Sequence, residues 1–388
     1  MTARAGRPSG PVVVFAGGGT GGHLCPGLAV ARWLQEADPS VRIAFFSTGR
    51  PVEQRLLTAS GFDVVRLRTR ASPAHWWGWP ATGLSQGAAT VGAVAHLRSL
   101  NVSVLVALGG YGSVAPGLGA WVLGRPIVVL EQNSIPGRAT RLLSLVADVV
   151  CTAWPETVAK LWRRTYAVTT GNPLRAEVLN GDPERGRRAA GLNARDPVLL
   201  VLGGSQGARA VNRWVTEGLP ALARELPRLQ VVHQTGESDH PWVTEAYREA
   251  DLRAWVQPFL TDIGDFYALA SVAVARAGAT TVAELAAAEV PAVLVPYPYA
   301  ADDHQRTNAR LAGDRGAAVI VEESEFERTN LPVVLGELLR DQSRRRQMVE
   351  ALRAFARPEA TELVGRCIES LLLHPHARGA ALMAGDGL

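Results

Sequence analysis

The chain repeats one local pattern in both of its halves: a short apolar run, a glycine-rich turn and then a helix-forming segment. In the first half, Val12–Ala16 is followed by GGGTGGH at residues 17–23; in the second, Val198–Leu202 is followed by GGSQGA at residues 203–208. Continuous apolar runs between helical segments are typical of parallel strands that are covered on both faces. The pattern therefore predicts the α/β class.

The same alternation continues along the chain. Further strands are expected at Val41–Ser47, Val102–Leu108, Ile127–Leu130, Val231–Gln234, Val272–Ala275, Ala292–Val295 and Ala317–Val321. Helices are expected to include Leu28–Glu36, Pro51–Ser60 and Val114–Leu123, and another is expected to begin at about Ala208. A C-terminal helix is expected from an apolar stripe, which consists of Leu363, Val364, Cys367, Ile368, Leu371 and Leu372. Because 388 residues exceed one typical core, the two series predict two similar domains that face each other.

The composition excludes several classes of protein. The chain is 47% hydrophobic and 20% charged, as globular proteins are. Its net charge of +4, from 40 basic and 36 acidic residues, is too small to predict nucleic-acid binding. Three cysteines without a CxxC pair favour a reducing compartment, and the N-terminal residues lack the apolar core of a signal peptide.

One uncharged stretch, residues 102–124, is long enough to cross a bilayer. It contains six glycines and Pro116, and its apolar residues come in two blocks. We interpret it as a buried strand, a glycine turn and a short helix.

Glycine turns between a strand and a helix let the backbone approach a ligand and place helix N-terminal amides near an anion. The first turn matches GxGxxG, but the second strand ends in STGR at residues 47–50, without the acid that a dehydrogenase needs. The second turn lacks the ending of a P-loop. The structural alternatives are that Ser205 only caps a helix and that GGYGS at residues 109–113 is only a tight turn.

Residues 276–284 open another helix. Thr281 and Glu284 have the spacing of a capping box, which is the interpretation that local geometry favours. The functional alternative is that the Glu284 carboxylate accepts hydrogen bonds from a sugar diol.

Eight blocks of the sequence together resemble the MurG family of peptidoglycan N-acetylglucosaminyltransferases. They follow the family's order from residue 12 to about 320: GGGTGGHLCPGLAVA, ALGGYGSVAPGL, LEQNSIPGRATRLL, GNPLR, LGGSQGAR, HQTG, ARAGATTVAELAAAEVPAVLVPYP and DDHQRTNA. The resemblance implies a GT-B fold, with two Rossmann-like domains whose parallel sheets face a central cleft. It implies an acceptor- and membrane-side domain at 1–172, a UDP-sugar-binding domain at 173–355, a helix at 356–374 returning to the first domain, and a disordered tail at 375–388.

The resemblance also implies the residues of the site. It places the donor against Thr20, Gly21, Gly22, Asn133, Arg175, Ser205, Gln206, Leu260, Ala279, Thr280, Thr281, Val282, Ala283, Glu284, His304 and Gln305. Of these, the Leu260 backbone matches the uracil contact, Glu284 the ribose contact and Gln305 the contact to the N-acetylglucosamine hydroxyls. Tyr111 and Glu131 match acceptor-side positions.

His23 matches either the general base of the family or a phosphate-binding histidine, with Glu131 as a lesser candidate for the base. Neutral imidazole is a fitting base near neutral pH. Helix N-terminal amides and an arginine can stabilise a UDP leaving group without a metal. No cofactor or metal is expected, because Asp302-Asp303 lacks the spacing of an Asp-x-Asp motif and is interpreted as a solvated turn.

The reaction that the resemblance implies is inverting transfer of N-acetylglucosamine from UDP-N-acetylglucosamine to undecaprenyl-diphosphoryl-N-acetylmuramyl-pentapeptide, in peptidoglycan synthesis, cell shape and cell division. Leu130 stands where the family usually has histidine, and Gly112 and Val114 where it often has valine and glycine. These departures affect the acceptor side. The alternatives are a UDP-sugar transferase with a soluble acceptor, a non-catalytic UDP-sugar-binding protein, and a UDP-sugar epimerase of the same architecture.

A lipid-linked acceptor calls for membrane association. Three tryptophans, Trp76, Trp77 and Trp79, follow Arg66, Arg68 and Arg70, and Trp121 can extend the group. Aromatic rings at headgroup level and cations toward anionic lipid are typical of an interfacial anchor. The sequence thus predicts a peripheral protein on an anionic membrane surface, at the cytoplasmic face; the alternative is that the tryptophans are buried under the glycine loops.

Overall fold

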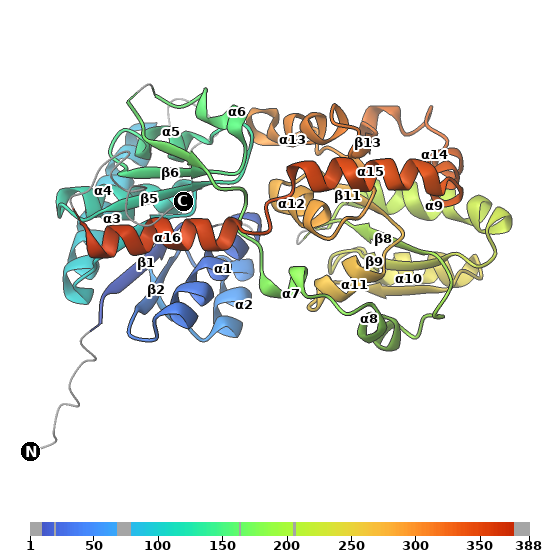
Figure 1. Ribbon diagram of the computed structural model, residues 1–388, viewed down its shortest axis with the longest axis horizontal. Coiled ribbons are helices and arrows are strands. Elements are labelled where there is room, and N and C mark those ends of the chain that lie inside the picture. Colours follow the sequence, from blue (N-terminus) through green and yellow to red (C-terminus); the bar gives the residue numbers. More distant parts are fainter. Residues whose placement is uncertain (1–9, 19–20, 68–78, 163, 205–206, 376–388) are drawn as a thin grey trace, which may run out of the picture. The chain divides into compact units, whose positions relative to one another are not determined.

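The computed structural model describes residues 10–18, 21–67, 79–162, 164–204 and 207–375. The chain divides into two compact units (Figure 1). The N-terminal unit is Met1–Pro173 together with Glu359–Leu388, and the C-terminal unit is Leu174–Pro358. The chain leaves the first unit at the Gly171-Asn172-Pro173 segment.

The N-terminal unit is built on seven parallel strands in the order β3-β2-β1-β4-β5-β6-β7. Their bounds are β1 Val12–Ala16, β2 Arg42–Ser47, β3 Asp63–Arg66, β4 Val104–Ala107, β5 Ile127–Glu131, β6 Val149–Thr152 and β7 Ala167–Thr169. All five residues of β1 are buried, as expected for a central strand with helices on both faces.

Alternate residues of β1 enter two different cores. The helices of this unit are α1 Gly21–Ala37, α2 Pro51–Ser60, α3 Trp79–Leu100, η2 Tyr111–Ser113, α4 Val114–Val122, α5 Arg138–Leu143, α6 Pro155–Val158 and α16 Ala360–Leu373. Val13 and Phe15 pack with apolar side chains of α1, α2 and α16. Val14 and Ala16 pack with α3, α4 and α5 on the other face.

Helix α16 belongs to the N-terminal unit although it follows the C-terminal unit in sequence. The predicted apolar stripe is confirmed, since Val364, Cys367, Ile368 and Leu371 are buried. Gly365 lies against α1 so closely that an added Cβ would be 2.2 Å from the Trp33 ring. A small residue at this position is therefore what lets α16 seat on α1.

The C-terminal unit has six parallel strands in the order β10-β9-β8-β11-β12-β13. Their bounds are β8 Val198–Leu202, β9 Gln230–Gln234, β10 Ala254–Gln257, β11 Val272–Arg276, β12 Ala292–Val295 and β13 Ala318–Ile320. Its helices are α7 Ala176–Leu179, α8 Pro183–Ala190, α9 Arg209–Glu225, α10 His240–Glu249, α11 Ile263–Leu269, α12 Ala279–Ala287, η3 Ala301–Asp303, α13 His304–Gly313, η4 Glu323–Glu325, α14 Leu331–Arg340 and α15 Gln342–Phe355.

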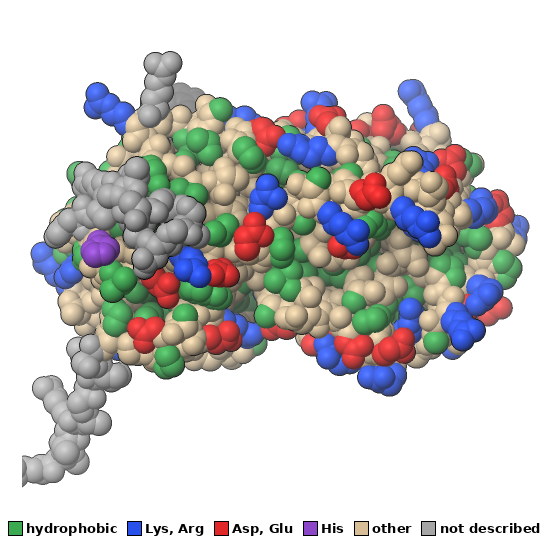
Figure 2. Space-filling model, in the orientation of Figure 1, with side chains coloured by type: hydrophobic (Ala, Val, Ile, Leu, Met, Phe, Trp, Pro, Cys, Tyr) green, Lys and Arg blue, Asp and Glu red, His purple; other side chains and the backbone are tan. Residues whose placement is uncertain are grey.

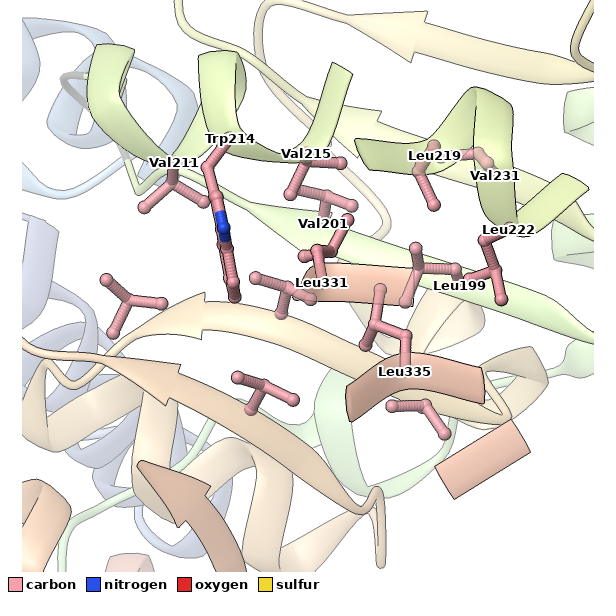
Figure 3. Packing of buried hydrophobic residues seen from close by; sticks show 14 of the residues in the cluster. Leu199, Val201, Val211, Trp214, Val215, Leu219, Leu222, Val231, Leu331 and Leu335 are labelled. Atoms are coloured by element: carbon pink, nitrogen blue, oxygen red, sulfur yellow. The ribbon is translucent and has the colours of Figure 1, made fainter. Parts of the chain in front are cut away.

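Helices α9 and α14 meet over one face of this sheet (Figure 3). Side chains of both helices and of β8 and β9 fill the core, among them Leu199, Val201, Val211, Val215, Leu219, Leu222, Val231, Leu331 and Leu335. The Trp214 ring stacks on Phe326 with a centroid distance of 4.4 Å. Outside the core, Figure 2 shows basic and acidic side chains interspersed on the face of this unit that it presents.

The strands and helices predicted from apolar runs are confirmed, with ends that differ by one or two residues in most cases. The sequence analysis did not predict β3, β6, β7 or β10; β3 carries mostly exposed residues. Residues 102–124 form β4, a glycine turn and α4, as predicted. Within the part of the chain that the structure describes, no helix has the length and apolarity needed to cross a bilayer. The predicted tail lies outside the described residues from 376 onward.

In each sheet, the strand that comes first in sequence lies in the interior, and later strands are added on both of its sides. β1 pairs with β2 and β4, and β8 pairs with β9 and β11. At such a topological switch point the loops after neighbouring strands diverge, and ligands bind outside the carboxyl ends of the strands. The loops that follow β1 and β4 are those of residues 17–23 and 109–113. The loops that follow β8 and β11 hold residues 203–208 and 277–278. The two switch points thus hold the predicted glycine loops and the start of α12.

Candidate active site

The two glycine loops of the N-terminal unit pack against each other. Gly17, Gly18, Gly109 and Gly110 all have positive φ, of +113°, +138°, +90° and +69°. The Gly18 N–H donates to the Gly109 carbonyl at 3.4 Å. A Cβ on Gly17 would lie 2.4 Å from that carbonyl oxygen. Glycine is therefore needed here for its conformation and for the close approach of two backbones, which an isolated tight turn at 109–113 would not require.

His23 lies in the first turn of α1, half-buried, with its ring toward Gly109. The point where Gly109 would carry a Cβ is 3.5 Å from His23 Nε2 and 3.9 Å from Gln132 Oε1. The ring is so close, with Cδ2 3.1 Å from that point, that a side chain at 109 would have to displace it. Gln132 follows β5 and was not among the residues predicted for the site, although it lies within one of the motif blocks.

A buried carboxylate holds the loop after β2 and lies beside the first glycine loop. Glu53 of α2 is 1% exposed. It accepts hydrogen bonds from the hydroxyls of Ser47 (2.6 Å) and Thr48 (2.9 Å) and from the N–H groups of Thr48 (2.8 Å) and Gly49 (3.0 Å). Its Oε1 is 3.3 Å from the Cβ position of Gly18. The sequence analysis found no acid at the end of β2 and missed this one, which reaches the same loop from the next helix.

The carboxylate of Glu131, the lesser candidate for a base, accepts hydrogen bonds from its own loop. It is 4% exposed. One oxygen accepts from the N–H and the side-chain amide of Asn133, at 2.9 and 3.2 Å, and the other accepts from the Gly137 N–H at 2.9 Å. Both oxygens are thus engaged in holding residues 133–137. Nearby, the Arg50 guanidinium lies 5.2 Å from the centre of the Tyr111 ring.

In the C-terminal unit a buried polar network fixes the start of α9, the helix that follows the second glycine loop. His233 bonds Tyr247 Oη at 2.9 Å and Asn212 Oδ1 at 3.0 Å. Asn212 Nδ2 in turn donates to Asp239 at 2.9 Å and to the Thr235 carbonyl at 3.0 Å. Desolvation lowers the pKa of His233 to about 3, so this imidazole is neutral and structural.

Glu284 of α12 is the most strongly engaged carboxylate of the C-terminal switch point. It is 6% exposed, receives the Tyr267 hydroxyl at 2.9 Å and faces Arg175 Nη2 at 3.4 Å. Burial raises its pKa, while Arg175 and the Tyr267 hydrogen bond oppose that rise. Tyr267 was missed by the sequence analysis, since nothing in its local sequence distinguishes it from a core tyrosine.

The capping-box interpretation of Thr281 and Glu284 is wrong. Helix α12 begins at Ala279 with Gly278 as N-cap, and no side chain caps it. Thr281 and Glu284 therefore lie inside the helix, and the carboxylate bonds to other elements. An uncapped helix N-terminus at a switch point favours an anion.

The other predicted donor residues of this unit lie in the loop after β10 and at the start of α13, which follows β12. The Leu260 N–H donates to Gln234 Oε1 at 3.0 Å. Gln305 Oε1 accepts the Tyr297 N–H at 3.0 Å, and His304 Nδ1 bonds the Ala301 carbonyl at 2.6 Å. Asp303 pairs with Arg306 at 2.8 Å.

The predicted residues are divided between the two units. Gly21, Gly22, His23, Tyr111, Glu131 and Asn133 belong to the N-terminal unit, and Arg175, Leu260, Ala279–Glu284, His304 and Gln305 to the C-terminal unit. Thr20, Ser205, Gln206, Arg68, Arg70, Trp76 and Trp77 lie outside the described residues, and Trp79 begins α3. Among the described residues no group of histidine, cysteine or acidic side chains could hold a metal ion.

Comparison with known proteins matches both units. The model of the glycosyltransferase family 28 N-terminal domain matches residues 13–152, and that of the C-terminal domain matches residues 198–364. A crystal structure of Acinetobacter baumannii MurG has a TM-score of 0.70 at 32% identity, covering 92% of this chain and 99% of the other.

Curated relatives match over nearly their whole length. Proteins of Halorhodospira halophila and Thermodesulfovibrio yellowstonii are 40% and 35% identical over 370 and 361 residues. These spans are 92% and 93% of this chain and 98% of each relative. Both are named UDP-N-acetylglucosamine–N-acetylmuramyl-(pentapeptide) pyrophosphoryl-undecaprenol N-acetylglucosamine transferase. The chain is therefore a hexosyltransferase with the GT-B fold and belongs to the MurG family within glycosyltransferase family 28.

Proposed function

We propose that this enzyme transfers N-acetylglucosamine, with inversion, from UDP-N-acetylglucosamine to the C4 hydroxyl of N-acetylmuramyl-pentapeptide-diphosphoryl-undecaprenol, converting lipid I into lipid II for peptidoglycan synthesis. The names of its relatives supply the substrates. The observation in this chain that carries the proposal is the Glu284 site, where a buried carboxylate stands on a helix whose N-terminus no side chain caps.

The donor is assigned to the C-terminal unit. The diphosphate suits the N-termini of α9 and α12, because helix N-terminal N–H groups carry partial positive charge. The Glu284 carboxylate can accept hydrogen bonds from a ribose diol, and Gln305 can do the same for sugar hydroxyls. The Leu260 carbonyl can accept from a uracil N–H.

The base and the acceptor are assigned to the N-terminal unit. As the acceptor hydroxyl attacks the anomeric carbon, a base must take its proton. His23 lies in the first turn of α1 with its ring against the Gly109 loop, whereas both oxygens of Glu131 accept hydrogen bonds from N–H donors of its own loop. These contacts favour His23 as the base and give Glu131 a loop-holding role. UDP leaves as its charge is stabilised by the helix N-termini and Arg175.

The direct test is incubation with labelled UDP-N-acetylglucosamine and a short-chain analogue of the lipid acceptor. A β(1→4)-linked disaccharide product supports the proposal. Transfer only to a diffusible scaffold would indicate the soluble-acceptor alternative. Conversion of the donor sugar without an acceptor would indicate an epimerase, and donor binding without turnover a non-catalytic binding protein.

A pH effect is expected from Tyr267→Phe. The Tyr267 hydrogen bond lowers the pKa of Glu284, so its loss raises that pKa and protonates the carboxylate at a higher pH. Arg175 is the other charged group acting on Glu284. Arg353, on the neighbouring helix α15, pairs with Glu289 instead. The acidic limb of donor kcat/KM should therefore move to higher pH.

The matched control is Tyr247→Phe, which removes a buried hydroxyl of the same unit that bonds His233 instead. Its acidic limb should stay where the wild type has it. Equal shifts in both variants would contradict a specific role of Tyr267 at Glu284.

We further propose that the enzyme works at the cytoplasmic face of the membrane as a peripheral protein. Exposed apolar side chains gather on α4, α5 and the segments after them: Trp121 (57%), Val122 (61%), Leu142 (44%), Leu145 (59%) and Trp162 (59%). Exposed Arg125, Arg138 and Arg141 lie among them. An apolar patch flanked by arginines suits an anionic bilayer surface.

The full chain is expected to sediment with anionic vesicles, less with neutral ones, and to dissociate partly as salt rises, because each arginine contributes about 1 kcal/mol that salt screens. Replacing Trp76, Trp77 and Trp79 with serine, or Trp121 and Leu145 with serine, should weaken sedimentation but spare transfer to a soluble acceptor analogue. Tyr299→Ser, on an 82% exposed aromatic of the other unit, is the control. Sedimentation equal to wild type in both sets would place the anchor elsewhere.

A further inference from the structure

Gln132 is a buried amide with one unused hydrogen-bonding atom. The residue is 3% exposed. Its Nε2 donates to the Leu108 carbonyl at 3.4 Å, while Oε1 has no partner among the described residues. Buried polar atoms are nearly always hydrogen-bonded, because desolvation without a partner costs free energy. The unused oxygen therefore calls for a partner from outside the chain.

The unpartnered oxygen lies close to the His23 ring, on the Gly109 side. Oε1 lies 3.9 Å from the position where Gly109 would carry a Cβ, and His23 Nε2 lies 3.5 Å from the same position. Any other residue at 109 would press on the His23 ring, whose Cδ2 is 3.1 Å from that position, and would also be strained, since φ is +90°. The imidazole and the amide oxygen thus both lie against the Gly109 backbone, with no side chain between them.

The chemistry of the oxygen restricts what can enter. A carboxamide oxygen only accepts hydrogen bonds, so its partner must be an O–H or N–H group. A diphosphate that is ionised at neutral pH offers acceptors only and does not fit. A sugar, with hydroxyls and an acetamido N–H, does fit. The neighbours Glu131 and Asn133 are bonded to each other, whereas Gln132 Oε1 has no partner among the described residues.

We propose that Gln132 binds the acceptor: its Oε1 accepts a hydrogen bond from a hydroxyl or the acetamido N–H of the acceptor sugar. This inference rests on the proposed function, and in particular on His23 as the base, because the reacting sugar must then lie next to Gln132. The bond orients the acceptor so that its attacking hydroxyl meets the imidazole. Gln132 does not exchange protons in the reaction.

The test compares Gln132→Leu with the wild type in steady-state transfer to the short-chain lipid acceptor analogue. Loss of one hydrogen bond should lower acceptor kcat/KM roughly 3- to 10-fold, with donor KM unchanged. Gln132→Glu, which keeps an acceptor oxygen, should retain more acceptor binding than Gln132→Leu. Gln54→Leu, on an exposed glutamine of the same unit, is the matched control and should behave as wild type.

Acceptor analogues identify the donor group and need no variant to fold. With wild-type enzyme, either an N-methylacetamido or a 6-deoxy analogue of the acceptor sugar should lower acceptor kcat/KM by the same roughly 3- to 10-fold factor. The Gln132→Leu variant should show the same acceptor kcat/KM with that analogue as with the unmodified acceptor. If neither analogue and neither variant changes acceptor kinetics, or if donor KM rises instead, the inference is overturned while the proposed function stands. If the wild type forms no disaccharide at all, both fail.

Discussion

His23→Ala is expected to lower kcat at least about 100-fold, the usual contribution of a positioned general base, while UDP affinity changes little. The expectation follows from the position of the ring in the first turn of α1, where its Nε2 is 3.5 Å from the point at which Gly109 would carry a Cβ. Steady-state kinetics with the lipid acceptor analogue and calorimetry with UDP measure the two quantities separately.

The control for this variant is His96→Ala, on an exposed histidine of α3 whose ring bonds the Gly92 carbonyl. It should leave both quantities unchanged. If His23→Ala weakens UDP binding as strongly as it lowers turnover, the histidine is a phosphate ligand. If it changes neither, His23 has no part in the site.

Glu284→Ala is expected to lower donor kcat/KM roughly 10- to 100-fold. Hydrogen bonds to a charged group contribute about 1.5–3 kcal/mol each, and about 1.4 kcal/mol corresponds to a factor of ten. Removing the carboxylate also leaves Arg175 and Tyr267 without it, so the melting temperature should fall. The donor series should include UDP-glucose, which tests the acetamido group independently of the ribose.

Glu289→Ala provides the comparison, because it removes a carboxylate of the same unit that pairs with Arg353 at the surface. Its donor kinetics should match the wild type. A Glu284→Ala protein with a lowered melting temperature but normal donor kinetics would make the carboxylate purely structural and would remove the observation on which the donor assignment rests.

Much of the fold follows from the sequence because its determinants are local. A run such as Val12–Ala16 or Val198–Leu202 is buried on both faces, so it must be apolar throughout, and this is visible without the structure. The glycines of residues 17–18 and 109–110 adopt positive φ, which other residues rarely do. Edge strands such as β3 lack this signature, and β3 was accordingly missed.

The candidate site was accessible from the sequence only as motif blocks and as a resemblance. His23, Glu131 and Glu284 could be named in that way, but what each carboxylate bonds could not. Local spacing predicted that Glu284 caps its own helix, whereas the structure turns it to Tyr267 and Arg175, which lie 17 and 109 residues away in sequence. Local spacing predicts the hydrogen bonds of a side chain correctly only where no residue distant in sequence binds the same group.

The sequence by itself therefore determined the α/β class, the two strand–helix series and the positions of the glycine loops, because periodicity and backbone conformation are properties of neighbouring residues. The tertiary structure alone decided that Glu53 holds the loop after β2 and lies beside Gly18, and that Gln132 Oε1, without a partner among the described residues, lies close to His23. The physical reason is that burial and hydrogen-bond satisfaction depend on groups that come close only when the chain has folded.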